Sequence, residues 1–60
     1  MNISFAVYDL DNDVTIINGY KELSKYLGMS LKEARHEVLM QERGKNIRTK
    51  EGLMIVKFNR

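Results

Sequence analysis

Apolar and polar residues alternate along the first part of the chain. Ile3, Phe5 and Val7 occupy every second position, as a strand with one buried face requires. Residues 11–13 read Asp-Asn-Asp and favour a turn, because these side chains tolerate positive φ and bind their own backbone. A short β-branched run follows at residues 14–17. The pattern predicts an N-terminal β-hairpin.

After the hairpin the apolar period lengthens to that of a helix. Tyr20, Leu23 and Leu27 fall on one face at helical spacing, which predicts a short amphipathic helix. Asn18 precedes this segment and is a residue type that caps helix starts. Gly28 follows the last periodic residue and suits the left-handed conformation that ends many helices.

A second helix is predicted to begin at Leu31. Ser30 and Glu33 have the spacing of a capping box, in which each side chain accepts a hydrogen bond from the backbone amide of the other residue. Gly44 is the expected stop, and Arg43 before it suits the negative end of the helix dipole. The expected apolar stripe consists of Leu31, Ala34 and Val38, with Leu39 at its border.

The C-terminal part predicts one strand or a second hairpin. Residues 46–49 are polar and compatible with a strand, and residues 50–52, Lys-Glu-Gly, favour a turn. Residues 53–58 read as a strand with Met54, Val56 and Phe58 on one face. Residues 1–60 are therefore expected to form a single α+β domain in the order ββααββ, or ββααβ if residues 46–49 are irregular.

Two helices joined by a tight turn that contains glycine are typical of a helix-turn-helix. Ser24 is small and stands where the second helix would cross the first, and Met29 can fill the corner between the helices. Ala34 supplies the small inward residue one turn into the second helix. Glu37 departs from the pattern, since an apolar residue is expected there, and Val38 can replace it if the second helix is rotated slightly.

These segments also resemble a known group of proteins. Residues 5–9, Phe-Ala-Val-Tyr-Asp, and residues 21–30, Lys-Glu-Leu-Ser-Lys-Tyr-Leu-Gly-Met-Ser, resemble small phage-encoded helix-turn-helix proteins of Gram-positive bacteria. They are also similar to the nuclease-associated modular DNA-binding repeats of homing endonucleases. The resemblance implies DNA binding through the second helix by a regulator or accessory factor rather than a nuclease. Small phage proteins also bind host proteins, so the resemblance is compatible with a protein partner too.

The charge is distributed unevenly between the two halves of the chain. The net charge is +2, with four acids and two bases in residues 1–30 and four acids and eight bases in residues 31–60, so the halves carry −2 and +4. Such asymmetry favours an anionic partner for the C-terminal half. Chance is the alternative explanation in a chain this short.

The predicted second helix concentrates several basic residues on one side. At 100° per residue, Lys32, His36 and Arg43 lie roughly 100° to 140° from Leu31, with Arg35 nearer the apolar stripe. Glu33 and Glu37 form an adjacent acidic side, so a solvated or protein-binding helix is the alternative. The expected nucleic-acid-binding residues are Ser30, Lys32, Arg35, His36 and Arg43 on the helix, and Lys45, Asn46, Arg48 and Lys50 beyond it.

Catalytic and metal-binding signatures are missing from the sequence. The chain has no Cys, no phosphate-binding glycine loop and no serine-nucleophile motif, so we expect no enzyme and no cofactor. Asp9, Asp11 and Asp13 alternate like the start of a calcium loop. Val14 and Tyr20 then occupy the positions that require Gly and an acid, so we read a solvated turn and expect no metal.

The sequence therefore leads to two hypotheses. The first is a regulator of a phage or mobile element, in the cytoplasm of a bacterial host cell, which inserts its second helix into the major groove of duplex DNA. A homodimer is expected to add specificity. The second is a protein-binding modulator or inhibitor without nucleic-acid binding, whose surface is the mixed-charge helix with Tyr26, Leu39 and Met40. No apolar run approaches the ~20 residues of a membrane span, and no membrane partner is expected.

Overall fold

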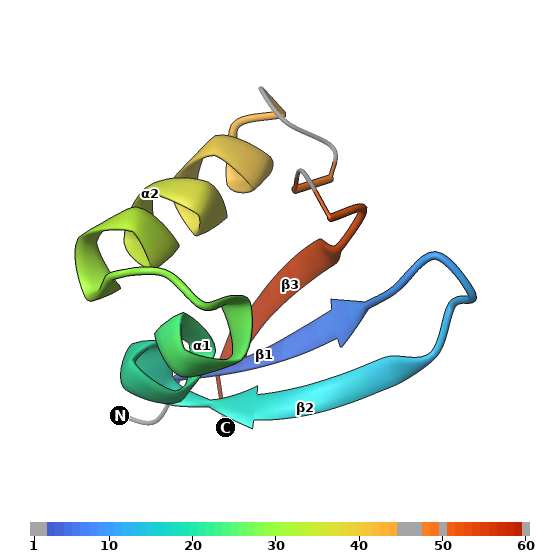
Figure 1. Ribbon diagram of the computed structural model, residues 1–60, viewed down its shortest axis with the longest axis horizontal. Coiled ribbons are helices and arrows are strands. Elements are labelled where there is room, and N and C mark those ends of the chain that lie inside the picture. The colour runs from blue at the N-terminus through green and yellow to red at the C-terminus, as the bar shows by residue number, and fades with distance from the viewer. Residues whose placement is uncertain (1–2, 45–47, 50, 60) are drawn as a thin grey trace.

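The computed structural model describes residues 3–44, 48–49 and 51–59. Within them a three-stranded antiparallel sheet is covered on one side by two helices (Figure 1). The sheet has the order β2-β1-β3, so the first strand is central. The elements in chain order are β1 (Ile3–Tyr8), β2 (Val14–Asn18), α1 (Gly19–Leu27), α2 (Leu31–Glu42) and β3 (Met54–Asn59).

The α+β class and the order ββααβ agree with the sequence prediction. The possible fourth strand at residues 46–49 is not seen in the part that the structure describes: residues 48 and 49 are outside any strand, and 46 and 47 lie outside the described residues. The chain turns back at Thr49 instead. Its amide donates to the Leu53 carbonyl at 2.8 Å, and its Oγ1 accepts from the Leu53 amide at 3.1 Å.

The β1–β2 connection confirms the predicted hairpin. Tyr8 pairs with Val14 at its end. The Asp9 carboxylate accepts hydrogen bonds from the amides of Asp11 and Asp13 at 2.9 and 3.0 Å, and Asn12 adopts a φ of 64°. These contacts are the backbone bonding that Asp and Asn favour in turns.

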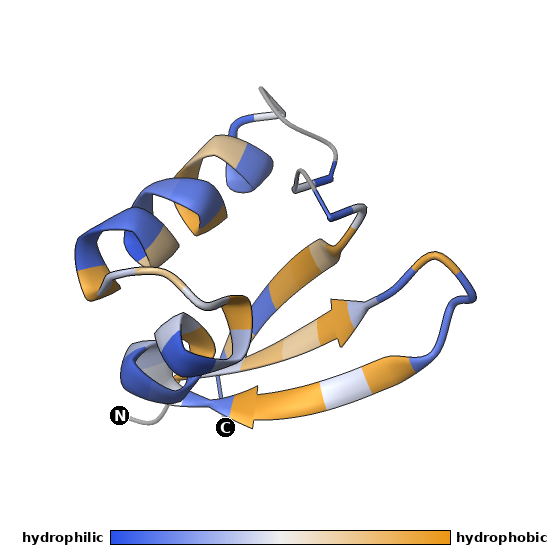
Figure 2. Cartoon of the chain, in the orientation of Figure 1, coloured by the Kyte–Doolittle hydropathy of each residue, from blue (hydrophilic) through white to orange (hydrophobic). Residues whose placement is uncertain are grey.

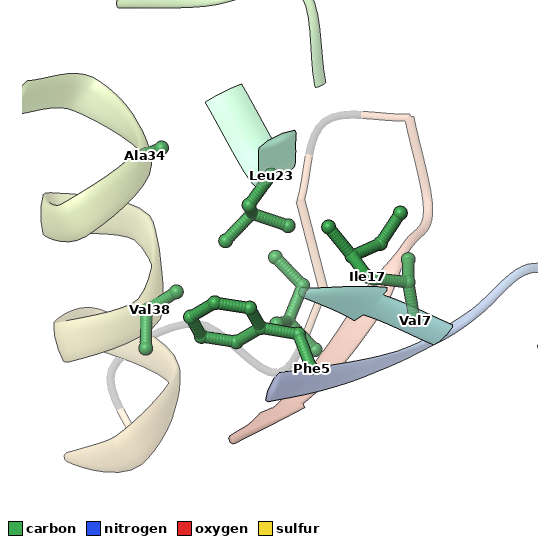
Figure 3. Packing of buried hydrophobic residues seen from close by; sticks show 7 residues of the cluster. Phe5, Val7, Ile17, Leu23, Ala34 and Val38 are labelled. Carbon is green, nitrogen blue, oxygen red and sulfur yellow. The ribbon is translucent and has the colours of Figure 1, made fainter. Parts of the chain in front are cut away.

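The core lies between the helices and one face of the sheet (Figure 3). Phe5 and Val7 project into it from the central strand, because alternate residues of a strand point to the same side. The Tyr20 ring at the start of α1 packs edge-on against Phe5, with ring centroids 4.9 Å apart. The buried residues of this cluster are Phe5, Val7, Ile17, Leu23, Ala34, Val38 and Ile55.

Two predictions for the helices are wrong in detail. Asn18 stands at the N-cap of α1, but its side chain does not cap the helix: its Oδ1 accepts a hydrogen bond from Ser4 Oγ at 2.9 Å. The sequence pattern assigns Leu31 to the buried stripe of α2, yet it is exposed, because this first residue of the helix projects beyond the core.

Val38 takes the inward position in α2 that the sequence left open. It is almost completely buried, while Glu37 is half-buried at the side of the helix. The helix is thus rotated so that Ala34 and Val38 face the core together. Neither α1 nor α2, the helices of the described residues, has the length and apolar character needed to cross a membrane.

The second face of the sheet carries apolar residues that no helix covers. Much of each strand is hydrophobic (Figure 2). We call this second face the open sheet face, and the alternation along the paired strands places its members on the side opposite to the core residues. On β3 the sequence pattern placed three residues on one side, and the structure turns that side outward while Ile55 enters the core. The large residues of the open sheet face are Tyr8, Val14, Ile16, Met54, Val56 and Phe58.

Candidate nucleic-acid interface

A tight turn of three residues connects α1 to α2. Gly28 adopts the left-handed conformation, with φ 69° and ψ 34°, as predicted. Its amide donates to the Lys25 carbonyl at 3.2 Å, and the Met29 amide donates to the Ser24 carbonyl at 3.0 Å. These bonds satisfy carbonyls at the end of α1 and redirect the chain at once into α2. Ser24 itself is buried beneath this turn.

The N-terminus of α2 is fixed by the predicted capping box. Ser30 Oγ accepts from the Glu33 amide, and Glu33 Oε1 accepts from the Ser30 amide, both at 3.1 Å. The backbone hydrogen bond from Ser30 is the main reason that the pKa of Glu33 lies below its ordinary value, and the Ser30 hydroxyl adds to the effect. Glu33 is therefore held at the helix start as a carboxylate with a structural role.

The basic residues of α2 lie mainly on its outward side. Ala34 and Val38 face the core, and the opposite side of the helix carries Lys32, His36 and Arg43. These three are exposed, with Arg43 at the C-cap directly after the last helical turn. They form a strip that runs along the helix, which we call the basic strip.

Arg35 is separated from the basic strip. Its guanidinium carbon lies 5.4 Å from the centroid of the Tyr20 ring, an arrangement typical of a cation–π contact. The residue is exposed, but its charged group lies over α1. The structure thus brings together the three basic-strip residues and places Arg35 on a different flank of α2.

An open groove of about 380 Å³ runs along the other flank of α2. Its lining mixes both signs of charge, and the Oε2 atom of Glu37 is buried there without a hydrogen-bond partner among the described residues. Glu37 thus faces this groove together with Lys32 and His36 of the basic strip. The lining residues are Met29, Lys32, Glu33, His36, Glu37, Thr49 and Glu51.

Only part of the second basic cluster falls within the described residues. Arg48 is exposed, and its Nη1 donates to the Gly52 carbonyl at 2.7 Å. This bond holds the side chain against the turn that leads into β3. The other predicted members, Lys45, Asn46 and Lys50, lie outside the described residues.

Gln41 has a role that sequence reasoning missed. Its Oε1 accepts from the Ile55 amide at 2.7 Å, and its Nε2 donates to the Leu53 carbonyl at 3.3 Å. Gln41 therefore bonds α2 to the outer edge of β3 as a neighbouring strand would. The next residue, Glu42, forms an ion pair with Lys57 of β3, with 3.2 Å between Glu42 Oε2 and Lys57 Nζ. No local sequence signal marks these contacts, because the partners are more than ten residues apart.

The three aspartates of the β1–β2 turn gather closely. Carboxylate oxygens of Asp9, Asp11 and Asp13 lie within 4.8 Å of one another. Asp9 already accepts two backbone hydrogen bonds, so the requirements of the turn account for the arrangement.

Comparison of the chain with models of protein families, with curated proteins and with solved structures finds no match.

Proposed function

We propose that the protein binds duplex DNA through α2, with the basic strip directed at the major groove and its phosphates. The proposal rests on the observation that Lys32, His36 and Arg43 share the exposed side of a helix whose opposite side is buried. A helix presented in this way has the dimensions to enter the major groove. Lysine and arginine on it can contact phosphates.

The connection between the helices supports a helix-turn-helix arrangement. The turn at Gly28, the buried Ser24 below it and the inward Ala34 are compatible with such a motif, whereas Glu37 stands where the motif favours an apolar residue and Val38 faces the core in its place. The N-terminal residues of α2 would then contact base edges, and Ser30 would lie near a phosphate. Glu33 and Glu37 remain next to the basic strip, and Glu33 is engaged in the cap of α2.

Fluorescence anisotropy with a labelled random duplex, over a range of salt concentrations, tests this proposal. The triple variant Lys32→Ala, His36→Ala, Arg43→Ala should lose most of its affinity. It removes two permanent charges, so the slope of log K against log salt should fall by roughly 0.9 for each phosphate that the variant no longer neutralises. The double variant Lys21→Ala, Lys25→Ala removes the same two charges from exposed positions of α1 and should bind like the parent.

Equal affinity and salt dependence in the triple variant and its parent would exclude α2 as the DNA-binding element. Circular dichroism of each variant establishes that the fold is retained, which is expected because every substituted side chain is exposed.

A specific observation also favours the second candidate, a protein-binding modulator. Tyr26, Leu31 and Leu39 are exposed on the helical layer, and Met40 is half-buried beside them. Exposed aromatic and aliphatic side chains are typical of protein contacts. Recovery of one stoichiometric protein partner, together with no binding of duplex DNA at low salt, would establish this function in place of the first.

A further inference from the structure

The two edges of the sheet differ in how their backbone groups are satisfied. At the outer edge of β3, Gln41 bonds to the Ile55 amide and the Leu53 carbonyl, and the exposed Lys57 adds a charge. Strand β2 forms the other edge, and its residues include neither a charge nor a proline and pair with β1 without a bulge. Charges, prolines, bulges and covering side chains keep strand edges from pairing with other molecules. Among the described residues, β2 has none of these protections.

The free backbone groups of β2 belong to Val14 and Ile16. The Asp9 amide donates to the Asp13 carbonyl at 3.1 Å, so this pair is hydrogen-bonded across the hairpin. Bonded and non-bonded pairs alternate in an antiparallel ladder, which makes Thr15 the next residue of β2 to bond to β1. The amides and carbonyls of Val14 and Ile16 therefore point away from β1, and no other described residue bonds to them. Both residues are exposed, at 52% and 48%, so another strand can reach them.

A second copy of β2 satisfies these groups when it lies antiparallel about a two-fold axis through Thr15. Val14 of each copy is then opposite Ile16 of the other, and each of these two pairs forms two amide–carbonyl hydrogen bonds. Asn18 offers no carbonyl, because it is the N-cap of α1 and its carbonyl accepts the first hydrogen bond of the helix. The free groups of β2 are thus complementary to a second copy of themselves in this register.

The side chains of β2 suit the same register. On the open sheet face, Val14 of each copy would contact Ile16 of the other, and on the opposite side Thr15 would meet Thr15 of the second copy. Pairs of β-branched apolar residues and pairs of threonines stabilise neighbouring strands. All three residues are exposed in the single chain and uncharged, so the pairing brings no like charges together.

Charge complementarity favours a second copy over an unrelated strand. The register places Asp13 of one copy opposite Ile17 of the other, at the end of the strand that leads directly into α1. The acidic turn formed by Asp9, Asp11 and Asp13 thus comes close to the N-terminus of α1 in the second copy. That end of a helix carries a partial positive charge, and α1 itself contains two lysines and one glutamate. The two-fold axis repeats this favourable contact on both sides.

We propose that β2 is a self-pairing edge, at which two copies of the chain join antiparallel about a two-fold axis through Thr15 and form one continuous sheet. The contact is only one strand wide, and its affinity comes from main-chain hydrogen bonds, as in other cases of strand addition. Contacts of this size give weak and transient dimers, so we expect association only at high micromolar to millimolar concentrations. This inference does not depend on DNA binding.

Sedimentation velocity of the chemically synthesised protein, without nucleic acid, tests the proposal. N-methylation of the Ile16 amide removes an outward donor and leaves every side chain unchanged. The parent should shift from monomer to dimer between micromolar and millimolar concentrations. The methylated protein should have a dissociation constant at least about 100-fold higher, because each copy loses a hydrogen bond and brings a methyl group into the contact.

N-methylation of the Lys57 amide is the matched control. This amide lies two residues after that of Ile55 and therefore also points outward, but from the edge of β3. The control removes the same kind of donor from the other edge of the sheet and should dimerise like the parent.

A single cysteine tests the register. The chain has no Cys, and Thr15→Cys would place its thiol next to the two-fold axis. Facing Cα atoms of a non-bonded pair lie about 4.5 Å apart, within the range of a disulfide. In a glutathione redox buffer, Thr15→Cys should form the linked dimer at least about tenfold faster than Lys25→Cys, an exposed control on α1. Non-reducing gel electrophoresis measures both rates.

Three results would overturn the proposal. The first is a parent protein that stays monomeric up to millimolar concentration. The second is association of the folded protein methylated at Ile16 that is as tight as that of the protein methylated at Lys57. The third is cross-linking of Thr15→Cys that is no faster than that of Lys25→Cys. Circular dichroism establishes that each protein is folded, and the cysteine variants decide the question if methylation prevents folding.

Discussion

Both faces of the sheet carry large apolar residues, but the helices cover only one of them. Phe5, Val7 and Ile17 on one face are buried beneath the helices, while Ile16, Val56 and Phe58 on the other remain exposed. Apolar content therefore does not decide which face is covered. The difference shows that coverage is decided by how the helices are attached to the sheet.

The two helices are attached to the sheet in different ways: α1 by the chain itself, and α2 by contacts between residues that are distant in sequence. α1 follows β2 without a loop, so it must lie close to the end of that strand. α2 is held at its far end by the bonds of Gln41 to β3 and by the ion pair between Glu42 and Lys57. Each of these links is a point at which the contrast between the two faces can be tested.

The largest effect is expected from a pair of phenylalanines on opposite faces. Phe5→Ala empties a fully buried position and should lower the free energy of unfolding by about 3–5 kcal/mol, a large part of the total for a chain of this size. Phe58→Ala removes the same group from the open sheet face and should cost about 1 kcal/mol. Urea denaturation of dilute protein measures both, and equal losses would contradict the contrast between the faces.

A smaller effect is expected at the link between α2 and β3. Gln41→Ala leaves the Ile55 amide without its partner, while the Leu53 carbonyl keeps the bond from the Thr49 amide, and it should lower the free energy of unfolding by about 1–2 kcal/mol. Faster exchange of the Ile55 amide hydrogen in the alanine variant would locate the effect. An unchanged exchange rate would show that the bond does not hold the edge.

The smallest effect is expected at the N-terminus of α2. Ser30→Ala removes one half of the capping box and should lower the free energy of unfolding by about 1 kcal/mol. The pKa of Glu33 is lowered in the folded protein, so its contribution is present above the ordinary carboxyl pKa and is lost as the pH falls through the folded value. Glu33→Gln should weaken this pH dependence. Thermal melts between neutral and acid pH measure it, and identical pH profiles for parent and variant would rule it out.

Features fixed by neighbouring residues could be predicted from the sequence. The turn at Gly28 and the capping box at Ser30 and Glu33 depend on bonds across a few residues, and both are present as expected. The alternation in the first strand likewise identified Phe5 and Val7 as core residues.

Features that depend on distant partners could not be predicted in this way. Asn18 is a residue type that often caps helices, but its side chain accepts a hydrogen bond from Ser4 on the neighbouring strand instead. The sequence placed Arg35 nearer the apolar stripe than the other bases of α2, but it did not identify the Tyr20 ring of α1 as the partner of its guanidinium. Gln41 carries no local signal, because its partners belong to a strand that follows only after a further turn.

The placement of both helices on one side of the sheet has a consequence for the tolerance of the chain to substitution. The core forms a single layer between the helices and the inner face of the sheet, and Ile16, Val56 and Phe58 lie outside this layer. A polar residue at one of these three positions changes only the outer surface, so the two faces of the sheet can vary in sequence independently of each other.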